Sequence, residues 1–246
     1  MRDAETTTSP RRFVIISSPR SGTHMLRTAL DSHPNLVCRA ESFNPDLVGP
    51  EPYDETWSTR AILDEHIYRP RHPVIEAAGF AVHRGGAPLG PWRDIWDHLT
   101  ADPELSVIVL HRDNLLRRLL SYQIMRERNR SRDPAFEPAP RTLHVEPLRD
   151  EFRRYEAELA DFRCRFADHR RFQVSYEQLR DHFPRTALRL QRFLGVRAHA
   201  IAPKTRPNPP RPPESLVTNL AELREAFRGS RWSWFFRRSG PALGLG

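Results

Sequence analysis

Short apolar runs alternate with longer amphipathic segments along this chain of 246 residues. Five runs rich in β-branched and apolar residues predict strands: Phe13–Ser17, Leu36–Arg39, Gly79–His83, Leu105–His111 and Phe172–Val174. The fourth run is apolar without interruption, which is typical of a strand that is covered on both faces. Because strands alternate with helical segments, the pattern predicts an α/β protein with a parallel, doubly wound sheet.

Helical periodicity follows most of these runs. Longer helices are predicted at Thr23–Ser32, Asn114–Glu127, Leu148–Phe166 and Glu177–Leu194, and a short one near Trp57–His66. The third long helix carries large apolar residues at steps of four and three: Leu148, Phe152, Tyr155, Leu159, Phe162 and Phe166. Such a stripe indicates core packing, so we expect one face of this helix to be buried.

Two segments interrupt the alternation. Asn44–Pro73 is rich in Pro, Asp, Tyr and His and predicts a long loop with one short helix. Arg206–Pro213 holds five prolines and predicts an extended segment. Such loops over a sheet edge usually determine which substrate is accepted. We expect one domain, residues 13–238, built on a P-loop-type sheet of about five strands with helices on both faces. A disordered tail, 1–12, precedes it and a short tail, 239–246, follows.

The net charge of +8 comes almost entirely from arginine, since Lys204 is the only lysine. Such an excess is compatible with a GC-rich genome, and also with binding of nucleic acid, an acidic lipid surface or a polyanionic small molecule. The basic residues are spread along the chain among acidic ones, and no compact nucleic-acid-binding motif is present. We therefore expect no nucleic-acid partner.

Aromatic and basic residues gather near the C-terminus: Trp232, Trp234, Phe235, Phe236, Arg237 and Arg238. One interpretation is peripheral contact with an anionic membrane. The interpretation that we favour is that these rings pack on the sheet or flank an adenine.

Cys38 and Cys164 form neither a CxxC pair nor a zinc-ligand spacing, so neither a disulfide framework nor a structural metal is expected. The apolar run Phe13–Ile16 is too short for a signal-peptide core or a membrane span. We expect a cytoplasmic protein.

The junction Phe13–Leu26 is the most informative stretch for function. An apolar strand runs into a turn of small residues that carries Arg20, and a helix pattern begins at Thr23. The first N–H groups of a helix lack partners within the helix, and its dipole adds partial positive charge there. With the planar guanidinium of Arg20, this turn predicts a phosphate or sulfate site.

This turn is not a Walker A loop, which reads GxxxxGK[ST]. No glycine opens the turn, and its cation, Arg20, comes two residues before Gly22. A second anion site is indicated at Arg112, directly after the most apolar strand, with Ser121 nine residues further on in the following helix. Ligands of doubly wound sheets bind at such carboxyl ends of strands.

Together these features resemble the PAPS-dependent sulfotransferases, where PAPS is 3′-phosphoadenosine 5′-phosphosulfate. The family's PxSGT-type loop is matched by Ser18–Thr23, and its 3′-phosphate site by Arg112 and Ser121. The resemblance is closest to the bacterial and Golgi carbohydrate branch, in which "SHPN" precedes an acidic residue, as Ser32–Asn35 precedes Glu41 here.

Two further segments carry the resemblance. Val174–Leu179, which contains Tyr176, is similar to the family's YE(D/E)L segment near the adenine. The stretch from Pro207-Asn208-Pro209 to Trp232 is similar to its C-terminal nucleotide-covering loop. The resemblance thus extends from about residue 13 to residue 232 with the motifs in the family's order.

The resemblance implies in-line transfer of a sulfuryl group from PAPS to a hydroxyl, with no metal required. The acceptor implied is a carbohydrate, a glycolipid or another small metabolite, beneath Asn44–Pro73 and Arg126–Leu143; a homodimer is left open. Arg20 would act on the sulfuryl group and the leaving phosphate. The residues implied in PAPS binding are Ser18, Pro19, Arg20, Ser21, Gly22, Thr23, His24, Arg112, Ser121 and Tyr176.

The acceptor hydroxyl needs a general base. Glu41 follows the second strand and is the first candidate; His83 ends the third strand and is the rival, since histidine titrates near neutrality. His24 is expected to support the loop. Bacterial relatives usually read Gly-Phe-Lys at the third strand, where this chain has Gly79-Phe80-Ala81, so Arg20 takes more of the task or Arg84 substitutes.

Two other functions stay open at this point. One is a small-molecule kinase that uses the same loop on ATP; it would need a magnesium-binding carboxylate near Thr23, which the sequence does not show convincingly. The other is a non-catalytic, basic nucleotide-binding protein.

Overall fold

The computed structural model describes residues 9–44, 53–69, 72–83, 90–131, 133, 135–204 and 211–237. Its internal contacts divide the chain into two compact units. The first consists of Met1–Arg112 and Asp161–Arg206, and the second of Asp113–Ala160 and Pro207–Gly246. The expected single domain over residues 13–238 stays a prediction.

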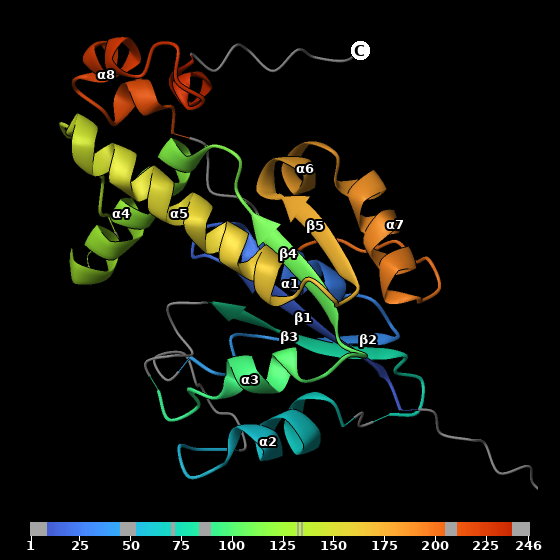
Figure 1. Ribbon diagram of the computed structural model, residues 1–246. Helices are drawn as coiled ribbons and strands as arrows, with labels where there is room; N and C mark the ends of the chain where they lie inside the picture. The colour runs from blue at the N-terminus through green and yellow to red at the C-terminus, as the bar shows by residue number, and fades with distance from the viewer. Residues whose placement is uncertain are drawn as a thin grey trace, which may run out of the picture. The chain divides into compact units, whose positions relative to one another are not determined.

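The first unit is built on a five-stranded parallel sheet in the order β2-β3-β1-β4-β5 (Figure 1). The strands are β1 (Arg11–Ser17), β2 (Leu36–Arg39), β3 (Ala77–His83), β4 (Ser106–His111) and β5 (Arg171–Ser175). The predicted fold class is therefore confirmed. β1 begins two residues earlier than predicted, so Arg11 and Arg12 belong to the sheet and not to the N-terminal tail.

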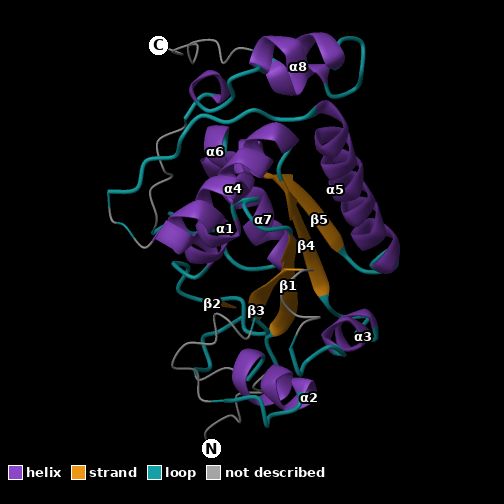
Figure 2. Ribbon diagram, turned by 90° about the vertical axis from the view of Figure 1, so that its left-hand side faces the viewer, coloured by secondary structure: helices purple, strands orange, loops and turns teal. Residues whose placement is uncertain are grey.

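Helices cover both faces of this sheet, with α1 and α7 on one side and α3 on the other (Figure 2). Their bounds are α1 (Thr23–Leu30), α2 (Thr59–Ala61), the π-helical turn η1 (Ile62–Ile67), α3 (Ile95–Thr100), α6 (Tyr176–Asp181) and α7 (Phe183–Leu194). Phe13, Val14, Ile15 and Ile16 in β1 are all fully buried. Successive strand residues point to opposite faces, so both faces of β1 are covered.

One segment that the sequence predicts as a single helix forms two helices. The segment Glu177–Leu194 forms two helices, α6 and α7, which are separated at His182 with φ −134° and ψ 39°. The reason is Pro184, which lies in the first turn of α7. Proline has no N–H to donate and its ring clashes with the preceding turn, so it begins a helix and does not continue one.

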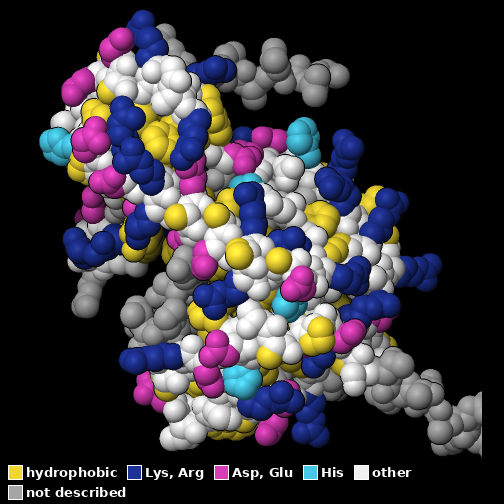
Figure 3. Space-filling view, viewed as in Figure 1, with side chains coloured by type: hydrophobic (Ala, Val, Ile, Leu, Met, Phe, Trp, Pro, Cys, Tyr) yellow, Lys and Arg dark blue, Asp and Glu magenta, His cyan; other side chains and the backbone are white. Residues whose placement is uncertain are grey.

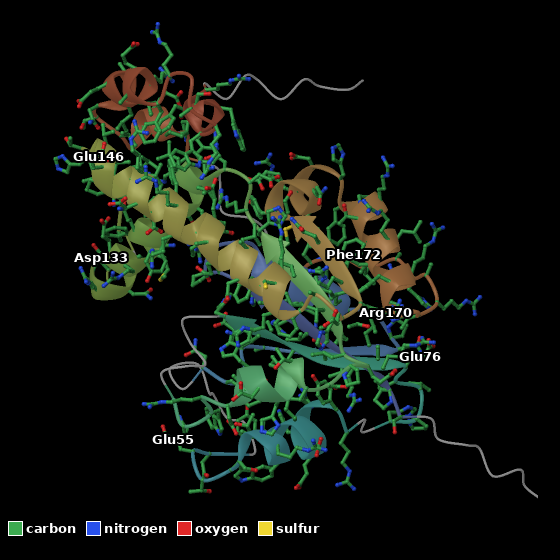
Figure 4. All side chains as sticks on the ribbon, in the orientation of Figure 1. Glu55, Glu76, Asp133, Glu146, Arg170 and Phe172 are labelled. Carbon is green, nitrogen blue, oxygen red and sulfur yellow. The ribbon has the colours of Figure 1, made fainter. Side chains whose placement is uncertain are left out.

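The helix α7 is fixed against the edge strand β5. The ring centres of Phe172 and Phe193 lie 5.4 Å apart, and Arg170 Nη2 donates to the carbonyl of Phe193 at 3.0 Å. Figure 4 labels Arg170 and Phe172 beside this helix. These contacts hold the edge strand whose carboxyl end carries Tyr176.

The second unit is helical. It contains α4 (Leu115–Ser131), most of α5 (Val145–Arg165), the short η3 (Pro213–Ser215), α8 (Leu220–Ala226) and η4 (Ser233–Phe236). The predicted apolar stripe of α5 is confirmed, since Leu148, Phe152 and Tyr155 are buried in the core of this unit.

The C-terminal aromatic residues form part of a core within the second unit. Trp232, Phe235 and Phe236 are buried there around Phe152. The expectation that they flank an adenine stays a prediction. Trp234 is 40% exposed. Three of the four rings are thus unavailable to a membrane. Arg238 and the tail 239–246 lie outside the described residues.

Basic and acidic side chains are interspersed on the surface, as they are along the sequence. In Figure 3, basic side chains are distributed over the visible face with acidic ones between them. No helix in the described part of the chain is long and apolar enough to cross a membrane. Within the same residues, no three His, Cys, Asp or Glu side chains are grouped so that they could hold a metal ion.

Candidate active site

The loop between β1 and α1 has the conformation of an anion cradle. Arg20 has a φ of 70° and Gly22 a φ of 95°, so the chain turns twice through the left-handed region before α1 begins. Gly22 is the N-cap of α1 and has no side chain that could occupy the first helical N–H groups. Such N–H groups are suited to bind an anionic oxygen.

Tyr176 closes one side of this cradle. A Cβ atom built on Gly22 would lie 2.8 Å from Tyr176 Cδ2, so only glycine allows the ring to approach the loop this closely. The guanidinium carbon of Arg112 lies 4.6 Å from the centre of the same ring. Arg112 Nη1 also donates to the carbonyl of Arg20 at 3.4 Å. The predicted residues Arg20, Gly22, Arg112 and Tyr176 therefore lie together.

The register of the sheet explains why these residues meet. His111 of β4 pairs with Ser175 of β5 in parallel, so Arg112 and Tyr176 leave the sheet side by side. Ser17 of β1 pairs with Leu110 of β4, which brings the loop with Arg20 to the same edge. Sequence reasoning assigned Glu177 only to its motif, but its Oε1 lies 3.9 Å from Arg112 Nε.

Two opposing effects act on the pKa of Arg20. Its side chain reaches the surface, but partial burial lowers its pKa, and the nearby Tyr176 opposes this. An arginine with a lowered pKa is still charged at neutral pH, because its ordinary value is above 12. Arg20 therefore brings a full positive charge to the cradle.

The two rival bases, Glu41 and His83, are direct partners. His83 Nε2 lies 2.7 Å from Glu41 Oε1. The other ring nitrogen, Nδ1, lies 2.9 Å from Ser17 Oγ and 3.0 Å from the Ser17 carbonyl oxygen. Ser17 Oγ in turn lies 2.8 Å from Thr23 Oγ1, in the first turn of α1. The base candidates and the loop therefore share one hydrogen-bond network.

Burial would raise the pKa of Glu41, but its partners reverse this. The hydrogen bond and charge of His83, the hydrogen bond from Asn44 Nδ2 and the charge of His24 together hold the pKa below its ordinary value. The pKa of His24 is lowered by burial first and by Arg27 second, while Glu41 raises it. Glu41 is thus a carboxylate at neutral pH.

The remaining predicted residues lie as follows. Ser18, Pro19 and Ser21 form the loop itself, and His24 is exposed on the first turn of α1. Ser121 lies on α4 in the second unit, and its role in binding the 3′-phosphate stays a prediction.

Ala81, where relatives carry lysine, is fully buried in the apolar core of the sheet. Arg84 and Pro207-Asn208-Pro209 lie outside the described residues.

Sequence reasoning missed Ser17 as a site residue. The signal was present, since Ser17 is the polar residue that ends an apolar strand, directly after Ile16. Its importance follows from the pairing of Ser17 with His83 across β1 and β3, which no local pattern contains.

Comparison with known proteins supports the sequence interpretation over nearly the whole chain. The chain is 28% identical over 250 residues to nodulation protein H of Rhizobium meliloti (strain 1021), covering 94% of this chain and 96% of the relative. It is 26% identical over 242 residues to nodulation protein H of Rhizobium tropici, covering 93% and 94%. The motif order and the parallel sheet agree with this full-length similarity. This full-length similarity is consistent with the resemblance of the chain to the PAPS-dependent sulfotransferases.

No family model matches the sequence. Among solved structures, a sulfotransferase from Alicyclobacillus acidocaldarius matches with a TM-score of 0.47 and 15% identity, over 95% of this chain and 98% of that one. A structural similarity with this TM-score and identity carries no argument about function.

Proposed function

We propose that this protein is a sulfotransferase that moves the sulfuryl group of PAPS to a hydroxyl of a carbohydrate, a glycolipid or another small metabolite. The observation that carries the proposal is the meeting of Arg20, Gly22, Arg112 and Tyr176 at one sheet edge, with the Glu41–His83 pair bonded to the same loop through Ser17. This sheet edge is where doubly wound sheets bind ligands.

The donor set fits the shape and charge of PAPS. The glycine-capped N-terminus of α1 and Arg20 suit the 5′-phosphosulfate, and Arg112 suits the 3′-phosphate. The Tyr176 ring offers an aromatic face for the adenine. PAPS supplies an activated sulfuryl group, and the protein contributes orientation and positive charge where charge develops on the leaving oxygen.

Glu41 is proposed as the general base. It is ionised at neutral pH and half-buried, and its Oε1 is oriented by His83 while Oε2 accepts from Asn44 Nδ2 at 3.1 Å. A carboxylate held at two oxygens has a fixed direction toward its substrate. Glu41→Gln should abolish transfer and leave nucleotide binding intact. Retained transfer in Glu41→Gln, with loss in His83→Ala, would assign the base to His83.

Thermal shift with the product nucleotide, 3′-phosphoadenosine 5′-phosphate (PAP), tests the donor site. PAP without metal should stabilise the protein, by about 2.7 kcal/mol at a hundredfold excess over Kd. The stabilisation should be lost in Arg112→Ala and in Ser121→Ala. Arg153→Ala, which removes an exposed arginine of α5 bonded to Asp150, is the matched control and should respond like the wild type. Stabilisation by ATP with magnesium alone would instead favour the kinase.

A hollow of about 460 Å³ in the second unit supports the acceptor class. It lies between one face of α4 and residues 139–143, within the segment expected to cover the acceptor. Arg141 is bonded through both terminal nitrogens to Glu127. Arg126 and Arg130 form no ion pair with any described acidic residue, and both line the hollow. Charged side chains such as these can donate hydrogen bonds to the hydroxyl groups of an acceptor.

Acceptor kinetics test this assignment. Arg126→Ala and Arg130→Ala should raise the KM for the acceptor and leave the affinity for PAP unchanged. Arg128→Ala removes an exposed arginine of the same helix that does not line the hollow, and it should change neither quantity. An unchanged acceptor KM in the first two variants would place the acceptor elsewhere.

A further inference from the structure

Four side chains join the proposed donor loop to the proposed base without a break. The links are Thr23 Oγ1 to Ser17 Oγ at 2.8 Å, Ser17 Oγ to His83 Nδ1 at 2.9 Å, and His83 Nε2 to Glu41 Oε1 at 2.7 Å. Ser17 is fully buried and Thr23 nearly so, and the His83 side chain is 10% exposed. Because these groups are buried, water competes little for their hydrogen bonds. The direction of one hydrogen bond therefore determines the direction of the next.

Two proton orders are possible in this chain, because hydroxyl groups and neutral imidazole each donate once and accept as well. The first satisfies every link, whereas the second leaves the contact between His83 Nε2 and Glu41 without a proton. In the first order, Thr23 donates to Ser17, Ser17 donates to His83 Nδ1, and His83 Nε2–H donates to Glu41. The carboxylate then receives a hydrogen bond. This stabilises its charged form and agrees with the lowered pKa of Glu41.

In the second order, the Thr23 hydroxyl donates outward. Ser17 then donates to Thr23, and His83 carries its proton on Nδ1, where the Ser17 carbonyl accepts at 3.0 Å. A carbonyl oxygen can only accept, so this contact suits a protonated Nδ1. The lone pair of Nε2 now faces the Glu41 carboxylate, which loses its hydrogen bond from His83 and therefore has a greater affinity for a proton.

An anionic oxygen at Thr23 selects between these orders. It can only accept hydrogen bonds, so it draws the Thr23 hydroxyl proton outward and favours the second order. From this geometry we infer that Ser17 and His83 are positioning residues that make Glu41 a stronger base when the donor loop holds an anion. The inference rests on the proposed function of that loop and that base.

The proton balance of the second order fits sulfuryl transfer. The acceptor hydroxyl gives its proton to Glu41, which shares it with His83 Nε2; the new ester bond forms as the bond between sulfur and the leaving phosphate oxygen breaks. His83 is then an imidazolium next to a carboxylate, and it returns one proton to solvent. A protein with an empty loop keeps the weaker base, so deprotonation of the acceptor is coupled to the presence of the donor.

Other polar and charged groups around Glu41 have different contacts. His24, on α1, acts on Glu41 through its charge, and Arg27 on the same helix acts on His24. Asn44 donates to the other carboxylate oxygen. Arg27 Nη1 is bonded to the Cys38 carbonyl at 3.4 Å. The connection from Thr23 to His83 therefore runs through Ser17, and the coupling is assigned to that path.

The tautomer of His83 is the direct measurement. ¹⁵N-resolved NMR of the imidazole at mildly alkaline pH distinguishes a proton on Nε2 from one on Nδ1. Addition of PAP should move the proton of His83 from Nε2 to Nδ1. His33 is the internal control, because Asn35 N–H donates to its Nδ1 at 3.0 Å and its Nε2 lies 2.8 Å from the Arg197 carbonyl. Its proton should stay on Nε2 throughout.

Two variants should disconnect the tautomer of His83 from the anion. In Ser17→Ala the hydroxyl that joins Thr23 to His83 is absent, and the charged Glu41 is a stronger acceptor than the Ser17 carbonyl, so His83 should keep its proton on Nε2 with or without PAP. In Thr23→Val, Ser17 still donates to Nδ1 but no hydroxyl senses the anion. His83 should therefore keep its proton on Nε2 at saturating PAP.

The outcomes separate the two proposals. If PAP binds and the wild-type tautomer does not change, or if Ser17→Ala still responds to PAP, the coupling is refuted while the donor site stands. If PAP does not bind at all, the proposed function fails and the coupling fails with it. A change in His33 that matches the change in His83 would mark a general effect of binding and would also refute the coupling.

Discussion

Gly22 combines two constraints that a single added atom would violate. Its φ of 95° is unfavourable for any residue with a Cβ, and the Tyr176 ring occupies the place of that Cβ. The first constraint concerns stability alone. The second concerns the contact that positions Tyr176 over the loop.

Gly22→Ala should therefore lose stability and nucleotide binding together. The left-handed backbone costs about 1–2 kcal/mol, and displacement of Tyr176 should weaken PAP binding strongly in calorimetric titration. Gly229→Ala separates the two effects, because Gly229 has a φ of 72° and a Cβ there would meet nothing within 4 Å. It should lose similar stability and keep full affinity for PAP. Equal affinity in both variants would contradict the contact with Tyr176.

Glu41 predicts a definite pH dependence of stability. Its pKa in the folded protein lies below the ordinary value of 4.5. A group of this kind stabilises the fold above its unfolded pKa, and the contribution is lost as the pH falls through the folded pKa. The difference in unfolding free energy between wild type and Glu41→Gln should be constant from neutral pH to about pH 5 and shrink below it. A difference that grows below pH 5 would be inconsistent with the lowered pKa of Glu41.

At the scale of elements, α6 begins with a capping box directly at the site. Ser175 Oγ accepts from Gln178 N at 3.2 Å, and Gln178 Oε1 accepts from Ser175 N at 3.0 Å. Tyr176 is the first residue after this cap. The cap therefore fixes the direction in which the Tyr176 ring leaves β5, as well as the start of the helix.

Ser175→Ala should cost about 1 kcal/mol of stability, which is typical for an N-cap, and it should also weaken PAP binding. Ser58→Ala is the matched control: Ser58 caps α2 by accepting from Ala61 N at 3.2 Å and lies in neither the loop nor the sheet edge. Chemical denaturation should show similar losses in both variants, while titration with PAP should show weaker binding only in Ser175→Ala. If both bind PAP equally well, the cap has no part in the site.

At the scale of the whole molecule, the two cysteines report on the integrity of the sheet. Cys38 lies in β2, is 1% exposed and has its pKa raised by burial and by Asp31, whereas Cys164 is exposed. Thiolate is the reactive form, so a thiol reagent reaches Cys38 only when the sheet opens. Cys164 is available in the folded protein.

PAP should slow the labelling of Cys38 and leave that of Cys164 unchanged, because a ligand that binds only the folded state lowers the population of open forms. Mass spectrometry of the labelled peptides measures both rates in one sample. The Arg112→Ala variant should show no protection by PAP. Equal slowing at both cysteines would instead indicate an effect of PAP on the reagent.

The strands, the anion loop and the second cation followed from the sequence, because each depends on residues close together in the chain. Apolar runs such as Phe13–Ile16 determine a buried strand wherever they fold, and the position of Arg20 before a helix is a local property. The break between α6 and α7 at His182 could also have been predicted, because Pro184 lies next to it in the sequence. It was missed because the apolar periodicity continues across it.

Only the tertiary structure decided how these pieces combine. The sequence left Glu41 and His83 as rivals, whereas the pairing of β2 with β3 makes them partners. The pairing of β1 with β3 adds Ser17 between them and the loop. The C-terminal aromatic residues gave no local sign that they pack around Phe152, many residues earlier. Hydrogen bonds and packing between distant segments depend on register and on the direction of side chains, and neither is encoded in the pattern of a single segment.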